Sequence, residues 1–163
     1  MKRFLLYCAL SIALLLVHLM MVPFLALANV VPDIVLIFVI VLAVMEGRMA
    51  ATIAGFCLGL LLDLLAGESS VLGLSALAKS VTGFAVGYSF SEGRALQTLG
   101  SYRFLVIVGA GALLHNALYF TIYLQGTSVS FVDAIVFHAV PGALYTMLIS
   151  VIPMFFFSRQ QPQ

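Results

Sequence analysis

The feature that most constrains this chain is a series of long apolar runs separated by breaks of a few polar residues. Hydrophobic residues make up 64% of the 163 positions and charged residues only 8%, against roughly 25% charged in a typical soluble domain. A soluble fold of this length cannot bury so much apolar surface, so lipid must be the solvent for most of it. The runs are continuous rather than alternating, which predicts an all-α integral membrane protein and not a barrel.

The runs predict six transmembrane helices in one membrane domain that covers residues 1–163. A span needs about 20 residues, so the second run is short and the sixth is long enough to tilt or kink. Pro141 lies inside the sixth run and removes a helix hydrogen bond there. The predicted spans are approximately 4–28, 32–45, 49–66, 71–90, 104–124 and 132–157.

The first run has a second interpretation, as a secretory signal. Lys2-Arg3 precedes it, and Ala26-Leu27-Ala28 resembles a cleavage site. Its apolar length of about 25 residues exceeds the usual 7–15 of a signal core. It also contains His18 and Pro23. We therefore expect it to be retained as the first span.

The basic residues of the short connections predict the orientation, because cytoplasmic loops carry an excess of Lys and Arg. With the N-terminus in the cytoplasm, the connections on the outer side, near residues 29–31, 67–70 and 125–131, contain no basic residue. An even number of spans then places both termini in the cytoplasm. The cytoplasmic segments contain Lys2, Arg3, Arg48, Arg94, Arg103 and Arg159.

Several classes of function are excluded or disfavoured. A net charge of +1 gives no basic face for nucleic acid, and the connections are too short for a soluble domain or a phosphate-binding loop. Cys8 and Cys57 lie in separate apolar runs without metal-ligand spacing. Ser75 and Lys79 share a helix face one turn apart, but no oxyanion-hole signature accompanies this dyad. We expect no catalysis, no cofactor and no metal.

The third and fourth spans carry small residues at every fourth position, which places each series on one helix face. Such stripes let helix backbones approach closely. The favoured interpretation is that they join the two spans into a tight hairpin, and the alternative is that one stripe receives a helix from a partner protein. Counted from the turn at residues 67–70, the predicted layers pair Asp63 with Ser75, Gly59 with Lys79, Gly55 with Gly83 and Ala51 with Gly87.

Two charged residues lie within this predicted hairpin. An unpaired charge in lipid costs at least about 2.5–3.5 kcal/mol, and Asp63 is within reach of the flexible Lys79 side chain on the neighbouring helix. A Lys79–Asp63 ion pair with Ser75 beside it is therefore the favoured structural interpretation. The functional alternative is that this pair orders an outward-facing pocket or a docking groove.

A second polar group lies on the fifth and sixth spans. His115 and Tyr119 are four residues apart and share a helix face with Tyr123, and His138 shares a face with Pro141 and Tyr145. An isolated histidine in a membrane helix is more often a hydrogen-bonded packing residue than a ligand. The alternative is a pocket formed by His115, Asn116, Tyr119 and His138. His18 stands alone in the first span.

The central part of the sequence resembles the MreD family of rod shape-determining membrane proteins over about 60 residues. The similarity begins at Pro32-Asp33 and Glu46-Gly47-Arg48 and continues through Gly55-Phe56 and Gly59-Leu-Leu-Leu-Asp63. It ends with Leu72-Gly73-Leu74, Ala76-Leu77-Ala78-Lys79 and Gly83-Phe84.

The resemblance implies a scaffold in the bacterial inner membrane that acts with the single-span protein MreC. It would lie beside RodA and its class B penicillin-binding protein, which together synthesise peptidoglycan. Cytoplasmic MreB filaments would also lie beside it. The resemblance also implies an architecture similar to the six-helix substrate-binding subunits of vitamin (ECF-type) importers.

We expect a non-enzymatic scaffold that binds MreC, with Asp33, Asp63 and Lys79 as the polar elements of its outer half. The alternative is a small-molecule-binding transport subunit with an outward-facing pocket lined by Asp63, Lys79, His115 and Tyr119. A fold analogy alone does not decide between them.

Overall fold

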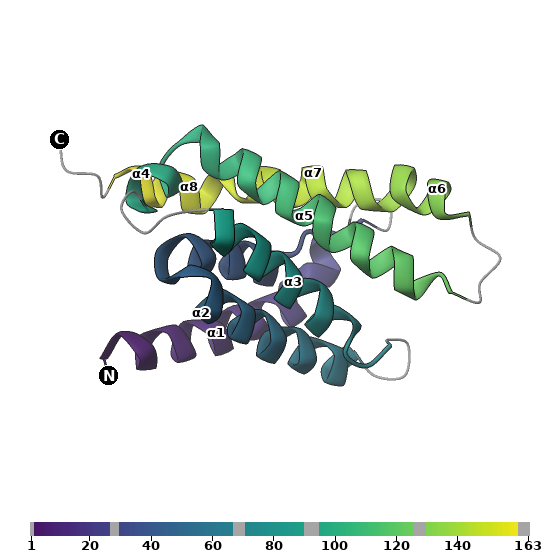
Figure 1. The fold of residues 1–163 in the computed structure, drawn as a ribbon, viewed down its shortest axis with the longest axis horizontal. Coiled ribbons are helices and arrows are strands. Elements are labelled where there is room, and N and C mark those ends of the chain that lie inside the picture. The colour runs from purple at the N-terminus through teal and green to yellow at the C-terminus, as the bar shows by residue number, and fades with distance from the viewer. Residues whose placement is uncertain (1, 27–29, 67–70, 90–94, 126–129, 160–163) are drawn as a thin grey trace.

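The computed structural model describes residues 2–26, 30–66, 71–89, 95–125 and 130–159. The elements in these ranges are all helical (Figure 1). They are α1 (Lys2–Met21), η1 (Val22–Leu25), α2 (Ile34–Ala66), α3 (Leu74–Ser89), α4 (Ala95–Leu99), α5 (Tyr102–Tyr123), α6 (Phe131–Ala134), η4 (Ile135–Ala139), α7 (Val140–Ile149) and α8 (Val151–Ser158).

Helix α2 consists of two helices joined at Gly47, where the backbone is non-helical with φ 82° and ψ −178°. That conformation is open almost only to glycine. A methyl group added at Gly83 would lie 2.9 Å from the carbonyl oxygen of Ala51 and 3.0 Å from the side chain of Val39. Two residues twelve positions apart in a straight helix would be about 18 Å apart. The chain therefore reverses at Gly47. Figure 1 shows the two halves of α2 side by side and running in opposite directions.

Side chains on both sides of Gly47 fix this reversal. The hydroxyl of Tyr7 in α1 donates a hydrogen bond of 2.7 Å to Glu46. The guanidinium of Arg48 lies over the rings of Phe84 and Tyr88 in α3, at 6.0 and 5.7 Å from their centroids. The Glu46-Gly47-Arg48 break therefore ties the hairpin to both neighbouring helices.

Helices α6, η4, α7 and α8 form one continuous helical segment, and its turn just before Pro141 is widened. The N–H of Val140 bonds to the carbonyl of Ile135, five residues back, as in a π-helix. Pro141 has no N–H, and its ring would clash with the carbonyl four residues earlier in a regular helix. A widened turn is a common way to accommodate such an interruption. The sequence predicted a lost hydrogen bond at Pro141 but not the π-turn.

In the described part of the chain, the six predicted helical segments are confirmed as helices. Three stretches there, Ile34–Leu65, Tyr102–Tyr123 and Phe131–Ser158, are long and apolar enough to cross a membrane. The first of the three contains the reversal at Gly47, and α1 contributes a shorter apolar stretch, Leu5–Met20. The chain is thus a helical membrane protein. The crossing of the membrane by all six segments stays a prediction.

Several boundaries differ from the prediction, among them the start of α3, which is Leu74 instead of residue 71. The first helix ends at Met21 and a 3-10 turn follows it, whereas the span was predicted to run to residue 28. The connection predicted between the fourth and fifth spans contains the short helix α4, whose Leu99 is completely buried. Five helical residues are too few to give a periodic signal in the sequence. The predicted turn at residues 67–70 lies outside the described residues.

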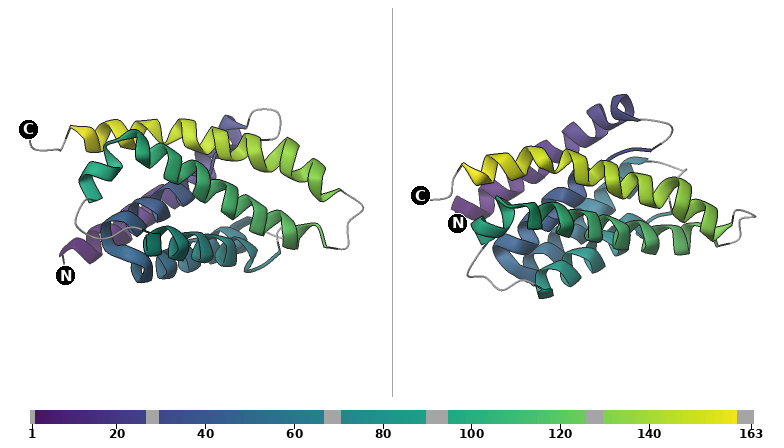
Figure 2. Two further views of the ribbon diagram at one scale, coloured as in Figure 1. Left: turned by 45° about the horizontal axis from the view of Figure 1, so that its top comes forward. Right: turned by 90° about the horizontal axis from the view of Figure 1, so that it is seen from above.

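The core is built around the first half of α2. Its residues from Val35 to Val44 are almost all buried, and they contact residues of α1, α3 and α5. Large apolar side chains on the outer faces, such as Met49 and Leu148, are exposed as expected for lipid contact. The start of α1 and the end of α8 lie at the same end of the bundle in every view (Figures 1 and 2). This arrangement fits an even number of spans, and the cytoplasmic placement of that end stays a prediction.

Candidate functional site

The glycine stripes of the central hairpin pack against the backbone of the opposite helix inside this protein. A methyl group added at Gly59 would lie 2.5 Å from the Cα atom of Ala76, and one added at Gly87 would lie 2.5 Å from the Cα atom of Arg48. At Gly55 the nearest atom would be the carbonyl oxygen of Lys79, at 2.7 Å. Each glycine thus admits the backbone of the opposite helix. The stripes are used within the hairpin, so they leave no groove for a partner helix there.

Three of the predicted layers of this hairpin are wrong by about one helical turn, whereas Asp63 contacts Ser75 as predicted. Gly59 lies level with Ala76 rather than Lys79, and Ala51 lies level with Gly83 rather than Gly87. The count from the turn treated the chain as helical throughout, whereas α3 begins only at Leu74. Small residues consequently face the backbone of the other helix rather than one another.

Two carboxylates hold the N-termini of helices. Oδ1 of Asp33 accepts the backbone N–H of Leu36 at 2.8 Å, which caps α2. Oδ2 of Asp63 accepts the N–H groups of Ser75 and Ala76, at 3.0 and 3.4 Å, in the first turn of α3. Each acid satisfies donors that a helix start leaves unpaired and lies where the helix dipole favours negative charge.

Lys79 pairs with Asp33 and not with Asp63, the partner that the sequence favoured. Its Nζ atom lies 2.5 Å from Oδ2 of Asp33, and only 2% of the lysine is exposed. The reversal at Gly47 explains this pairing, because it brings the start of α2 beside Lys79 of α3. The pair joins residues 46 positions apart in the sequence.

His115 extends this pair into α5. Its Nε2 atom lies 3.2 Å from Nζ of Lys79, and its Nδ1 atom lies 3.2 Å from Oδ1 of Asn116. An ammonium group can only donate, so Nε2 must accept and the ring proton must sit on Nδ1. The imidazole is therefore neutral. It accepts a hydrogen bond from Lys79 and donates one to Asn116.

The backbone of the η4–α7 segment links the two ends of this series of hydrogen bonds into a ring. Asn116 donates to the carbonyl oxygen of Ala139 at 2.8 Å. The hydroxyl of Thr146 accepts the backbone N–H of Asp33 at 3.0 Å and donates to the carbonyl of Gly142 at 2.8 Å. We call this set the polar ring; its side chains belong to Asp33, Lys79, His115, Asn116 and Thr146. It connects α2, α3, α5 and the η4–α7 segment, and Thr146 was not among the predicted site residues.

A cavity of about 720 Å³ lies beside the polar ring. His18 of α1, which the sequence left alone, also lines this cavity. The signal that could have added His18 to the predicted pocket is the presence of an isolated histidine in an apolar helix. No group of three metal-ligating side chains lies together in the described ranges. The predicted polar and pocket residues that line the cavity are Asp33, Asp63, Ser75, Lys79, His115, Asn116, Tyr119 and His138.

One wall of this cavity is aromatic. The rings of His115 and Tyr119 stack with centroids 6.2 Å apart, and those of Phe120 and His138 also lie 6.2 Å apart. Tyr145 is not among the residues that line this cavity, and its hydroxyl donates to the carbonyl of Leu25 at 3.0 Å.

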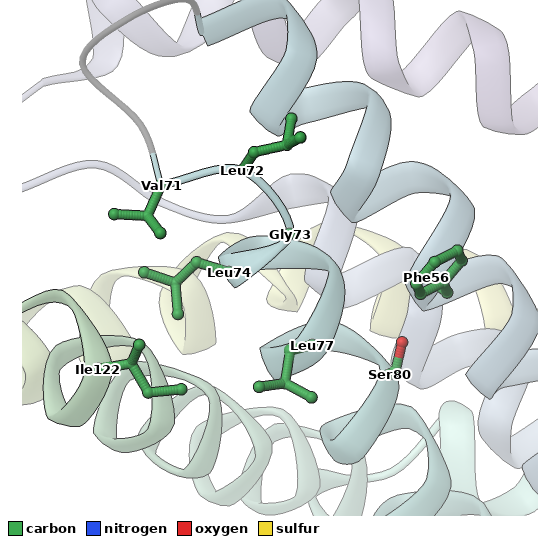
Figure 3. Close-up of a pocket in the computed structure, with 8 residues that line it drawn as sticks. All are labelled: Phe56, Val71, Leu72, Gly73, Leu74, Leu77, Ser80 and Ile122. Atoms are coloured by element: carbon green, nitrogen blue, oxygen red, sulfur yellow. The ribbon is translucent and has the colours of Figure 1, made fainter.

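A second hollow, of about 450 Å³, lies on the outer face between the second half of α2, α3 and α5 (Figure 3). Phe56, Leu77 and Ile122 contribute to its apolar lining. Its polar side chain, Ser80, already donates to the carbonyl of Ala76 at 2.6 Å. We call this hollow the apolar groove; it offers shape rather than polar contacts.

The family comparison agrees with the resemblance noted in the sequence. No curated protein and no solved structure is similar enough to the chain to extend this comparison. The family model described as rod shape-determining protein MreD matches residues 1–160, which is nearly the whole chain. The chain therefore belongs to the MreD family of rod shape-determining membrane proteins.

Proposed function

We propose that this protein is a non-enzymatic scaffold of the bacterial inner membrane that binds MreC. Through MreC it helps to position RodA, its class B penicillin-binding protein and MreB filaments for peptidoglycan synthesis. The observation that carries the proposal is the family match over residues 1–160.

The use of the polar residues supports a scaffold. Asp33 and Asp63 are committed to helix N-termini, and Lys79 is neutralised by Asp33. These contacts hold the two halves of α2 and helix α3 at fixed positions, which a docking platform requires. A nucleophile or a general base would need an available proton acceptor instead.

The apolar groove is the proposed site of the MreC transmembrane helix. In lipid, helices associate through close packing rather than through hydrophobicity, so a concave apolar surface is the useful feature. Phe56 and Leu77 are about half exposed, at 51% and 48%. Both project from helices that the glycine stripes lock together, so the groove keeps its shape.

Site-specific photocrosslinking in native membranes tests this proposal. Probes at Phe56 and Leu77 are expected to crosslink to MreC, whereas probes at Leu6 and Leu148, which are exposed apolar residues on other helices, are not. Crosslinks to MreC from all four positions, or from the two control positions alone, would reject the groove as the docking face.

The cavity is a specific observation in favour of the alternative, a small-molecule-binding transport subunit. Its volume of about 720 Å³ falls within the ~300–1,000 Å³ of typical ligand pockets. A transport subunit needs an ATPase and a coupling protein. Genes for those two proteins beside the gene of this chain would favour transport, and genes for MreB and MreC would favour the scaffold.

A further inference from the structure

The cavity beside the polar ring is separate from the apolar groove and has a different chemistry. It is formed by residues of α1, the segment before α2, the end of α2, α3, α5 and the η4–α7 region. A space of about 720 Å³ bounded by so many elements is a candidate for a ligand site. A ligand in this cavity would not depend on the proposed binding of MreC.

The charges at the cavity balance one another. Asp33 and Asp63 contribute two negative charges and Lys79 one positive charge. The two acids cap the N-termini of α2 and α3, and each N-terminus is equivalent to roughly half a positive charge. His115 is neutral because it accepts from Lys79. Each carboxylate and the ammonium at the cavity thus has a partner, so a ligand that brought a net charge would enter this partly buried space uncompensated.

The aromatic wall selects the shape of the ligand. Tyr119 and Phe120 are partly exposed, line the cavity and meet edge to face, with centroids 5.7 Å apart. Such rings favour a planar aromatic group against their faces or edges.

The hydrogen-bonding groups of the cavity select polar substituents. The ammonium of Lys79 has three N–H bonds, and its contacts within the described part of the chain use two of them. Ser75 and Tyr119, which each carry a hydroxyl group, also line the cavity. These groups suit an amide or hydroxyl substituent, which can both donate and accept.

We propose that this cavity binds an uncharged, planar aromatic small molecule that carries amide or hydroxyl groups. The aromatic ring lies against Tyr119 and Phe120, and the polar substituent reaches Lys79 and Ser75. The bound molecule contacts α1, α3, α5 and η4 together, so it stabilises the arrangement of these helices.

Three probes of nearly the same shape test this proposal: benzamide, benzoate and benzamidinium, which are neutral, anionic and cationic. Each is titrated by ligand-observed NMR against the protein in lipid nanodiscs, with empty nanodiscs to correct for partition into lipid. Benzamide is expected to bind saturably, and at least about tenfold more tightly than either charged probe, because neither charge finds compensation. Equal binding of all three, tighter binding of a charged probe, or no binding of benzamide would overturn the proposal.

A pair of variants locates the binding. Tyr119→Ala removes a ring of the cavity wall and is expected to weaken benzamide binding at least about fivefold, in line with the cost of removing a stacking partner. Tyr123→Ala is the matched control, because this ring stacks on Tyr119 at 5.5 Å but does not line the cavity. Unchanged binding in Tyr119→Ala, with the protein folded, would overturn the assignment. Crosslinking of MreC from Phe56 is measured separately, so either proposal can fail alone.

Discussion

The Lys79–Asp33 pair gives the sharpest prediction about stability. Asp33→Asn removes the negative charge but retains a side chain that can cap α2. The ammonium of Lys79, only 2% exposed, then loses its counter-ion, and its remaining side-chain contact is His115 at 3.2 Å. Breaking a buried pair from one side costs about 3–5 kcal/mol. We expect a loss of about 3 kcal/mol in the free energy of unfolding, near the lower limit because Asp33 itself is partly exposed.

Lys79→Met tests the same pair from the other side. It leaves the Asp33 carboxylate without its ammonium, and we again expect a loss of about 3 kcal/mol. The double variant Asp33→Asn with Lys79→Met leaves no unpaired charge, so it is expected to be more stable than either single variant.

The assay is reversible unfolding in mixed micelles, followed by circular dichroism. Asp133→Asn is the matched control, because it makes the same chemical change at an exposed carboxylate. It should alter stability by no more than about 0.5 kcal/mol. Additive losses in the double variant would refute the reasoning, since they would mean that the two charges do not stabilise one another.

Three further predictions concern backbone contacts and buried donors, all measured by the same unfolding assay. Gly59→Ala brings a methyl group to 2.5 Å from a backbone Cα atom of α3 and should cost about 1–3 kcal/mol, whereas Gly109→Ala meets only a flexible methionine side chain at 3.2 Å and should be tolerated. Equal effects of the two substitutions would contradict the close packing of the hairpin. Gly47→Ala forces φ 82° on a residue with a Cβ and should cost about 1–3 kcal/mol; no loss would mean that the reversal does not need a glycine. Thr146→Val leaves the N–H before α2 unpaired and should cost about 1–3 kcal/mol, but Thr121→Val, at an exposed hydroxyl, should not; equal stability of the two variants would count against the polar ring.

The local features of this fold could be predicted from the sequence. The continuous apolar runs predict the six helical segments, because the length of a run and the spacing of its apolar residues are properties of each segment alone. The steps of four from Gly55 to Gly59 and from Gly83 to Gly87 predicted two faces on which small residues meet another backbone. Glu46-Gly47-Arg48 was recognised as a break in the apolar pattern.

The pairing across the fold could not be predicted in the same way. Whether Lys79 meets Asp63 or Asp33 depends on how the two halves of α2 fold against each other at Gly47. Several such arrangements satisfy the same apolar pattern. The place of Thr146 in the polar ring likewise depends on the π-turn before Pro141, which shifts the phase of every later residue. These contacts follow from three-dimensional packing rather than from spacing along the chain.

Affinity purification from native membranes, with quantification of MreC, tests most directly whether this protein is a scaffold that binds MreC. We expect MreC to co-purify with the unmodified protein and with Leu148→Trp, whose new ring lies on another exposed face. We expect MreC to be largely lost from Leu77→Trp, which fills the apolar groove. Absence of MreC from the unmodified protein would contradict the scaffold, and retention of MreC by a folded Leu77→Trp variant would contradict the groove.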